Sequence, residues 1–228
     1  MLEVKDVKYS YIKGKPVLDG LSFSTGDESV VLYGGLGFGK STLCKIIARE
    51  IKKFDGDVLI NGTSIKKKKA KELNVSYITE DFMLSKNQTV RRNAAEALIV
   101  KRTPIEKIPP LVDEALKICG LFEYGDVLAK RLSDCDMFFT ALSRSLAKKP
   151  DLIIVDDVFS GKSKEEKLRL YGKILPVLSS LSYPVLFVTS EDYIAKAFDK
   201  RTLVLSYGKL AYDGLFSKSV YDTSPQEQ

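Results

Sequence analysis

Residues 34–41 are Gly34-Gly35-Leu36-Gly37-Phe38-Gly39-Lys40-Ser41, and Thr42 follows them. They fit the pattern G-x-x-x-x-G-K-[ST], and they lie between a short apolar run (29–33) and a helical pattern (42–51). Small residues let backbone N–H groups wrap around a chain of phosphates, and the N-terminus of the following helix adds a positive dipole end. A plain glycine turn before a helix is the alternative, but the pattern and its context favour a phosphate-binding loop.

Two side chains in this loop and one far from it are candidates for the chemistry. Lys40 is expected to reach the β- and γ-phosphates of a nucleoside triphosphate, and the Ser41 hydroxyl is expected to ligate Mg²⁺. A second magnesium ligand should end an apolar strand, and Leu152-Ile153-Ile154-Val155-Asp156 supplies one about 115 residues later. Alone, this segment could be any buried strand with polar residues at its end. After a phosphate loop, it predicts that Asp156 holds Mg²⁺ directly or through water.

Composition excludes several kinds of chemistry. The 228 residues contain no histidine, which rules out Ser-His-Asp triads, histidine zinc sites and histidine general bases. Lys and Arg number 36 against 30 Asp and Glu, so the formal charge is 36 − 30 = +6. That excess suits phosphate-bearing ligands but is too weak to indicate nucleic acid, and none is expected. Three widely spaced cysteines without a CxxC pair argue against a thiol metal cluster and suggest a reducing compartment.

Strand and helix signals alternate along most of the chain. Alternation over 2–7 and 17–23 predicts two half-buried strands with a turn at 14–16 between them. Short apolar runs predict further strands at 57–60, 75–78, 152–155 and 185–188, and a final hairpin at 201–206 and 209–212. From about 89 to 148 a 3.6-residue periodicity replaces these signals and predicts a helical insert broken by prolines 104, 109 and 110.

The expected fold is therefore α/β, with a mainly parallel sheet, an N-terminal antiparallel β subdomain and an inserted α-helical subdomain. One domain is expected over 1–228, with the helical subdomain at about 88–148. The lysine run 66–69 is most simply a solvated loop, and the polar tail 222–228 is expected to fray. The opening residues contain no apolar signal core, and the charge-free stretch 174–190 is short for a bilayer span. The chain itself is not expected to cross a membrane.

In these motifs and their order, the sequence resembles the ATP-binding cassette family, the nucleotide-binding subunits of ABC transporters. Residues 34–43 are similar to that family's extended phosphate loop, with Leu36 where the family has asparagine. The segment 141–147 before Pro150 and the Asp156 strand also matches. The resemblance implies a P-loop NTPase fold with ATP and Mg²⁺ as ligands. It implies that Tyr11 stacks on adenine, although Tyr11 could simply pack on the first sheet.

The residues that the family uses for catalysis differ here. The glutamate that positions the attacking water corresponds to Asp157, whose side chain is one methylene shorter. Asp157 could equally be a helix N-cap or a weak base. The family's switch histidine corresponds to Ser190, and its glutamine after the third strand corresponds to Glu80. Glu80 is expected to be a solvated or magnesium-side carboxylate rather than a general base.

The signature loop departs most from the family pattern. The family's L-S-G-G-Q corresponds to Leu132-Ser133-Asp134-Cys135-Asp136, which would bring two carboxylates toward the γ-phosphate of a partner cassette. The family's S-A-L-D segment is also altered, to Ser160-Gly161-Lys162-Ser163. Ser-x-x-Asp is also a signature of a helix start, so this loop is expected to keep a structural role after losing its phosphate contact.

The resemblance implies an ATP-binding subunit of an ABC-type transporter, located peripherally on the cytoplasmic face of a membrane. Its partners would be a second cassette, as homodimer or heterodimer, and membrane-spanning transporter subunits. The altered residues predict slow hydrolysis or none. The alternative is a nucleotide-gated regulatory or assembly protein that binds ATP without driving transport.

Overall fold

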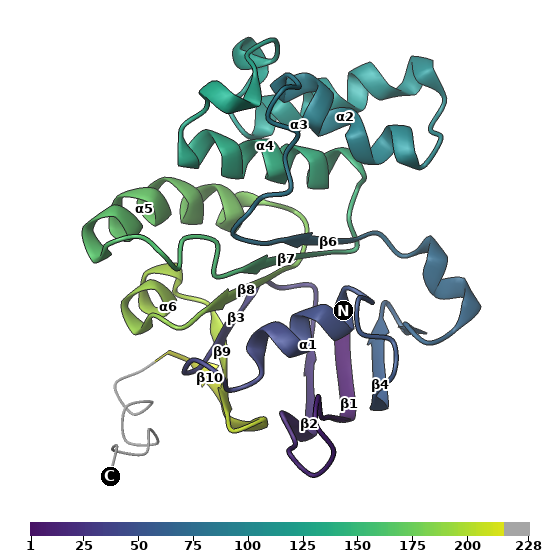
Figure 1. The fold of residues 1–228 in the computed structure, drawn as a ribbon, viewed down its shortest axis with the longest axis vertical. Helices are drawn as coiled ribbons and strands as arrows, with labels where there is room; N and C mark the ends of the chain where they lie inside the picture. The colour runs from purple at the N-terminus through teal and green to yellow at the C-terminus, as the bar shows by residue number, and fades with distance from the viewer. Residues whose placement is uncertain (217–228) are drawn as a thin grey trace.

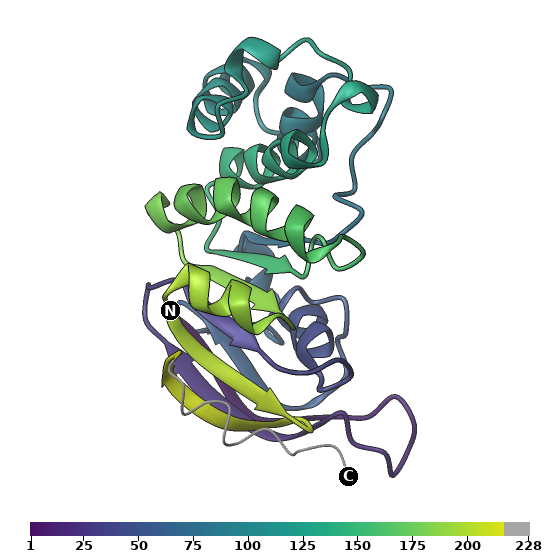
Figure 2. The same ribbon diagram turned by 90° about the vertical axis from the view of Figure 1, so that its left-hand side faces the viewer.

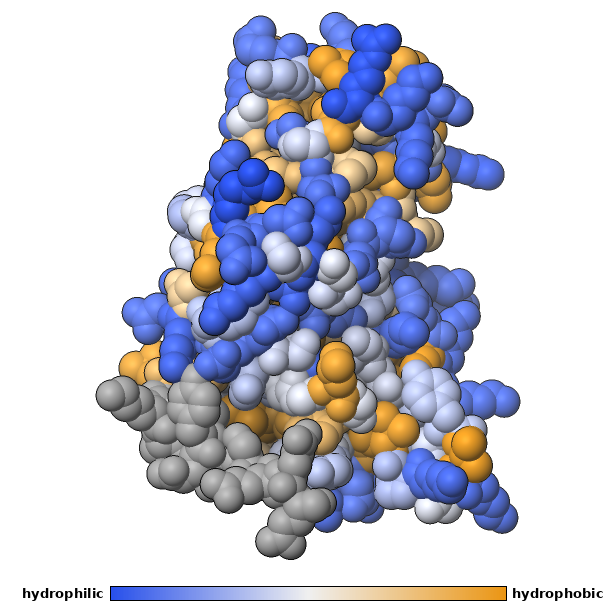
Figure 3. Space-filling model, turned by 60° about the vertical axis from the view of Figure 1, so that its left-hand side comes forward, coloured by the Kyte–Doolittle hydropathy of each residue, from blue (hydrophilic) through white to orange (hydrophobic). Residues whose placement is uncertain are grey.

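We describe residues 1–216 of the protein from a computed structural model. The tail 222–228, for which fraying was predicted, lies outside the described residues. Figure 1 shows an antiparallel sheet, a second sheet flanked by helices, and a helical layer farthest from the first sheet. The face seen in Figure 3 is mostly hydrophilic, and apolar residues gather on it over the helical layer. The proposed division into one domain with a subdomain at 88–148 stays a prediction.

The first sheet has four strands in the order β2-β1-β4-β5. Their bounds are β1 (Leu2–Tyr9), β2 (Leu18–Thr25), β4 (Asp55–Ile60) and β5 (Thr63–Ser64). β1 pairs with β2 and with β4, both antiparallel, and its alternate residues Leu2 and Val4 are buried. The alternation of apolar and polar residues therefore predicted this antiparallel pair correctly.

The second sheet has six strands in the order β10-β9-β3-β8-β7-β6. Their bounds are β3 (Val30–Tyr33), β6 (Val75–Ile78), β7 (Leu152–Asp156), β8 (Val185–Thr189), β9 (Arg201–Ser206) and β10 (Lys209–Leu215). All neighbours pair in parallel except β9 and β10, which form the antiparallel hairpin that the sequence predicts. The α/β class with a mainly parallel sheet is confirmed.

Helix α1 (Lys40–Ile47) follows β3 and packs its buried face between the two sheets. Leu43, Ile46 and Ile47 are fully buried there, together with residues of both sheets. The helix predicted over 42–51 begins earlier and ends earlier. It stops because Arg49 adopts φ 64°, the left-handed conformation that ends helices.

The helical layer consists of α2 (Val90–Val100), α3 (Ile108–Ile118) and α4 (Asp134–Ala147). Figure 2 shows it beyond α5 (Lys164–Ser180), with α6 (Asp192–Phe198) on the same side of the parallel sheet as α5. Pro109 and Pro110 lie in the first turn of α3, where a missing N–H breaks no helical hydrogen bond. Pro104 lies between α2 and α3, so the break predicted inside the helical insert is confirmed, and so is the insert.

Candidate functional site

The loop 34–39 connects β3 to α1, so it lies at the carboxyl end of a central parallel strand. Gly37 and Gly39 have φ values of 79° and 97°, a region that residues with a Cβ rarely adopt. A Cβ at Gly34 would lie 2.3 Å from the Leu205 carbonyl oxygen of β9. Glycine is therefore required both for the turn of the loop and for its close approach to the neighbouring strand.

Lys40 curls back across its own loop. Its side chain is 7% exposed, and Nζ donates to the carbonyl oxygens of Gly34 at 2.7 Å and Gly35 at 2.9 Å. Burial lowers the pKa of the Lys40 ammonium, while the nearby Asp157 and Asp156 carboxylates act in the opposite direction. An ammonium held only by neutral carbonyls can exchange them for phosphate oxygens at little cost, because a charged acceptor makes the stronger hydrogen bond.

The structure brings Ser41 and Asp156 together, as the sequence predicts. Ser41 Oγ donates to Asp156 Oδ1 at 3.2 Å, although 115 residues separate the two in the chain. Asp156 ends β7, and burial raises the pKa of its carboxyl despite the hydrogen bonds it accepts. Two hard oxygen ligands side by side suit Mg²⁺, which is usually held by one or two carboxylates together with substrate phosphates. The described residues contain no cluster of three or more acidic or thiol ligands, and such a magnesium site needs none.

Tyr77 is a member of this site that the sequence reasoning missed. Its hydroxyl donates to Asp156 Oδ2 at 2.7 Å, and burial together with the Asp156 charge raises the pKa of the phenol. The usable sequence signal was the strand expected at 75–78: once it pairs with β7, Tyr77 lies opposite Ile154, and Asp156 lies two residues farther on the same face. Tyr77 therefore fixes one carboxylate oxygen and leaves the other beside Ser41.

Of the aromatic side chains around the loop, Tyr11 and Tyr207 are exposed and Phe38 is half-buried. Tyr11 is 58% exposed, its ring packs edge-on against Tyr9, and its hydroxyl lies 3.4 Å from Thr42 Oγ1. Phe38 packs against Tyr207 of the β9–β10 turn, with ring centroids 4.6 Å apart. Tyr11 therefore lies next to the phosphate loop, where an exposed ring could accept a stacked base.

Asp157 and Ser190 also meet, since β7 and β8 are parallel neighbours that end at the same edge. Ser190 Oγ donates to Asp157 Oδ2 at 2.6 Å. Asp157 has φ 43°, which costs about 1 kcal/mol or more for a residue with a side chain. Asp157 does not cap a helix, because α5 begins with Ser163 as its N-cap. The helix-cap reading of Asp157 is therefore wrong.

Glu80 is bound to the loop that follows β7. Its carboxylate accepts hydrogen bonds from Ser160 Oγ at 2.8 Å and from the Gly161 N–H at 3.2 Å. These two residues belong to the altered Ser160-Gly161-Lys162-Ser163 segment. A magnesium role for Glu80 stays a prediction, and the hydrogen bonds give this carboxylate a clear structural role.

The altered signature loop starts α4. Ser133 is the N-cap, and its Oγ accepts from the Asp136 N–H at 3.2 Å and donates to the Asp136 carboxylate at 2.6 Å. The predicted helix start is confirmed. Asp134 forms an ion pair with Lys162, with 2.6 Å between Oδ2 and Nζ. Two residues that depart from the resembled pattern therefore contact each other within one chain.

A glycine loop between a parallel strand and a helix, with a lysine inside it and a hydroxyl beside a strand-end aspartate, defines the P-loop class of nucleotide-binding proteins. The family described as "ABC transporter" matches residues 18–160. The chain belongs to this family of ATP-binding cassettes.

Curated relatives cover nearly the whole chain. The spermidine/putrescine import ATP-binding protein PotA of Haemophilus influenzae is 26% identical over 215 residues, which are 94% of this chain and 58% of PotA. The methionine import ATP-binding protein MetN of Helicobacter pylori is 30% identical over 220 residues, covering 94% of this chain and 67% of MetN. The chain thus spans little more than half the length of PotA.

Solved structures share the fold. That of cbiO1 from Clostridium perfringens, described as part of the ABC transporter complex cbiONQ, has a TM-score of 0.81 at 22% identity, covering 97% of this chain and 90% of cbiO1. A dimeric post-hydrolysis structure of the cassette MJ0796 bound to ADP and Pi has a TM-score of 0.76 at 22% identity, covering 95% of this chain and 99% of that one. Within the described residues, no helix has the length and apolar character needed to span a bilayer.

Proposed function

We propose that this chain binds MgATP and acts as the ATP-binding subunit of an ABC-type transporter, with slow hydrolysis of its own. The observation that carries this proposal is the meeting of Lys40, Ser41 and Asp156 at one edge of the parallel sheet. The relatives named as import ATP-binding proteins support an import system.

In this proposal the phosphate loop and the residues around it bind different parts of MgATP. The backbone N–H groups of 34–42 surround the phosphates, Lys40 contacts the β- and γ-phosphates, and Tyr11 stacks on the base. Ser41 and Asp156 would hold Mg²⁺, with Glu80 as a further candidate ligand. When bound, Mg²⁺ neutralises charge on the phosphates and polarises them toward attack.

The residues around the γ-phosphate position support slow hydrolysis. Asp157 would have to orient the attacking water, but its short side chain is bound by Ser190 at 2.6 Å. A displacement of roughly 1 Å at such a position can reduce a rate by about 10²-fold. Ser190 can donate a single hydrogen bond where the resembled family has an imidazole, so it would stabilise the transition state less.

The proposed role in a transporter requires two kinds of partner, a second cassette and membrane-spanning subunits. A second cassette, identical or different, would complete each site across a dimer interface, where Asp134 and Asp136 would face a partner's phosphates. Membrane-spanning subunits would dock on the helical layer. A cavity of about 270 Å³ lies there between residues 85–88 and α2, and the exposed side chain of Val100 lines it. The protein would then lie on the cytoplasmic face of the membrane.

The test is to purify the chain and its native complex, and to measure ATP binding and turnover with each. We expect magnesium-dependent binding by the chain alone and turnover far below that of an active cassette. Absence of binding would overturn the whole proposal, whereas normal turnover that Lys40→Ala abolishes would overturn only the slow hydrolysis. Recovery with a soluble partner and no membrane protein would favour the alternative, a nucleotide-gated regulator.

A further inference from the structure

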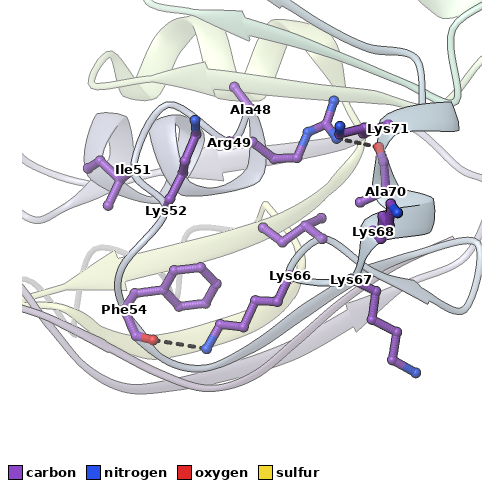
Figure 4. Close-up of a pocket in the computed structure, with 11 residues that line it drawn as sticks. Ala48, Arg49, Ile51, Lys52, Phe54, Lys66, Lys67, Lys68, Ala70 and Lys71 are labelled. Atoms are coloured by element: carbon purple, nitrogen blue, oxygen red, sulfur yellow. Dashed lines mark hydrogen bonds between the residues drawn. The ribbon is translucent and has the colours of Figure 1, made fainter.

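A groove of about 880 Å³ lies at the C-terminal end of α1, away from the phosphate loop at its N-terminal end. Residues 48–54 form one wall and residues 65–71 form the other, as Figure 4 shows. Small-molecule sites usually measure roughly 300–1,000 Å³, so the groove has the size of a ligand site. The eight residues of α1 span about 12 Å, which separates the groove from the nucleotide.

The groove is lined by cations and by no carboxylate. The six charged residues in its lining are Arg49, Lys52, Lys66, Lys67, Lys68 and Lys71. The whole chain has an excess of 36 − 30 = 6 positive charges. Without the six cations of the groove, its Lys and Arg would equal its Asp and Glu in number. Six like charges around one depression repel one another and favour an anion between them.

Two of the six cations hold the groove together. Lys66 Nζ donates to the carbonyl oxygens of Phe54 at 2.9 Å and Gly56 at 2.5 Å, and lies 4.1 Å from the centroid of the Phe54 ring. The Arg49 guanidinium donates to the Ala70 carbonyl oxygen on the opposite wall. Both contacts fix the spacing of the walls with neutral acceptors, so they leave the positive charges uncompensated.

The other four cations are free to contact a ligand. Lys52, Lys67, Lys68 and Lys71 are exposed, and none of them forms an ion pair within residues 1–216. The negative end of the α1 dipole favours cations in its last turn, but it cannot account for lysines contributed by a separate segment. A solvated loop, as the sequence suggested for 66–69, explains the exposure but not the convergence of two segments on one depression.

We propose that this groove binds a small soluble anion that carries several adjacent phosphate groups, independently of the nucleotide loop. Lysine ammonium groups act as point charges on phosphate oxygens, and several of them side by side favour an anion that carries several negative charges. The concave shape suits a small molecule that enters between the walls. Ile51, Phe54 and Ile65 add apolar lining to the two walls for the rest of such a ligand.

The test is calorimetric titration of the full chain with inorganic tripolyphosphate, in a Lys40→Ala background that weakens the phosphate loop. We expect one binding event per chain, weakened by added salt because the partners are exposed charges. The triple variant Lys67→Gln, Lys68→Gln and Lys71→Gln should bind about tenfold more weakly. The matched triple Lys107→Gln, Lys130→Gln and Lys173→Gln removes the same charge from exposed positions elsewhere and should leave affinity unchanged.

Two further measurements separate binding in the groove from binding at the phosphate loop and from loss of folding. With Lys40 intact, the groove triple should retain ATP affinity, so its effect is separable from the nucleotide site. Should the triple fail to fold, Lys52→Glu on the other wall must weaken tripolyphosphate binding instead. No binding, or equal loss in the control triple, overturns the proposal. So does binding only to vesicles containing phosphatidylglycerol, or only to RNA, because the ligand is then not a small soluble anion.

Discussion

The phosphate loop and the loops that carry Asp157, Glu80 and Asp134, here called the accessory loops, hold their charged side chains in different ways. In the phosphate loop, Lys40 is held by backbone carbonyls and Ser41 by a single carboxylate. In the accessory loops, the carboxylates contact other groups of the same chain: Asp157 contacts Ser190, Glu80 contacts Ser160 and Gly161, and Asp134 contacts Lys162. The neutral carbonyls around Lys40 can be exchanged for phosphate oxygens, whereas the carboxylates of the accessory loops would have to leave their present partners before they could act on a ligand. We therefore expect the binding and the cleavage of ATP to be separable in this chain.

The largest effect is expected at Lys40. Lys40→Ala removes the buried ammonium from the phosphate loop, and ATP affinity should fall roughly 100-fold. Fluorescent-nucleotide titration measures the change, and a melting curve checks that the variant is folded. Lys45→Ala, an exposed lysine on the same helix, is the control and should change affinity little. Equal losses in both variants would mean that Lys40 acts only through overall charge.

The next effect is a gain in rate. Asp157→Glu lengthens the carboxylate by one methylene, and single-turnover hydrolysis should rise about tenfold while ATP affinity stays constant. Phosphate release from preformed enzyme–ATP complex is the measurement. Asp157→Asn keeps the shape without the charge and should not accelerate the reaction. If the rate stays unchanged in Asp157→Glu, the length of the side chain at position 157 is not what limits hydrolysis.

A smaller effect is expected for magnesium. In the native chain, ATP should bind about fivefold more tightly with Mg²⁺ than after EDTA has removed the ion, and Asp156→Asn should abolish this magnesium preference. In the native chain this preference should disappear on acidification, because protonated Asp156 is a poor ligand. Since burial raises the pKa of Asp156, the loss should begin at a higher pH than for an ordinary aspartate.

The control for that experiment is Tyr77→Phe. It keeps the Asp156 carboxylate but removes a hydrogen bond that favours its charged form. The magnesium preference should therefore persist at neutral pH and disappear at a still higher pH than in the native chain. A magnesium preference that survives in Asp156→Asn would place the ion on other ligands.

The smallest effect concerns the hydrogen bonds of Glu80. Glu80→Ala should lower the free energy of unfolding by about 0.5–1 kcal/mol, because two exposed hydrogen bonds to a carboxylate are lost. Hydrogen exchange should become faster across residues 158–163, and a loss of magnesium-dependent ATP affinity in the same variant would show that Glu80 is also a magnesium ligand. Glu114→Ala, an exposed glutamate in the helical layer, is the control and should alter neither quantity. Unchanged exchange in Glu80→Ala would show that other contacts hold this loop.

Local pattern was enough to predict most of the fold and the meeting of Ser41 with Asp156. Strand alternation, the glycine loop and the apolar strand ending in Asp156 are short-range signals, and the parallel sheet then brings Ser41 and Asp156 together. The predicted end of α1 was wrong because Arg49 adopts a left-handed conformation, which is uncommon for residues other than glycine and cannot be predicted from its type.

The contacts of the accessory loops could not be predicted from local pattern. The pair of Asp134 with Lys162 and the hydrogen bonds of Glu80 to Ser160 and Gly161 join loops far apart in the sequence. Each of these side chains has several partners of suitable charge, and only the packed structure selects one. The basic groove has the same origin, because its two walls are separate segments brought together by β4, β5 and α1.

The packing of Phe38 on Tyr207 ties the phosphate loop to the turn between β9 and β10. Tyr207 is 69% exposed, so a larger ring fits there, and the sequence contains no tryptophan. Tyr207→Trp would thus introduce a single indole whose emission responds to the position of Phe38. The chain would then carry its own optical sensor, with which nucleotide arrival and departure could be followed in real time without a labelled ligand.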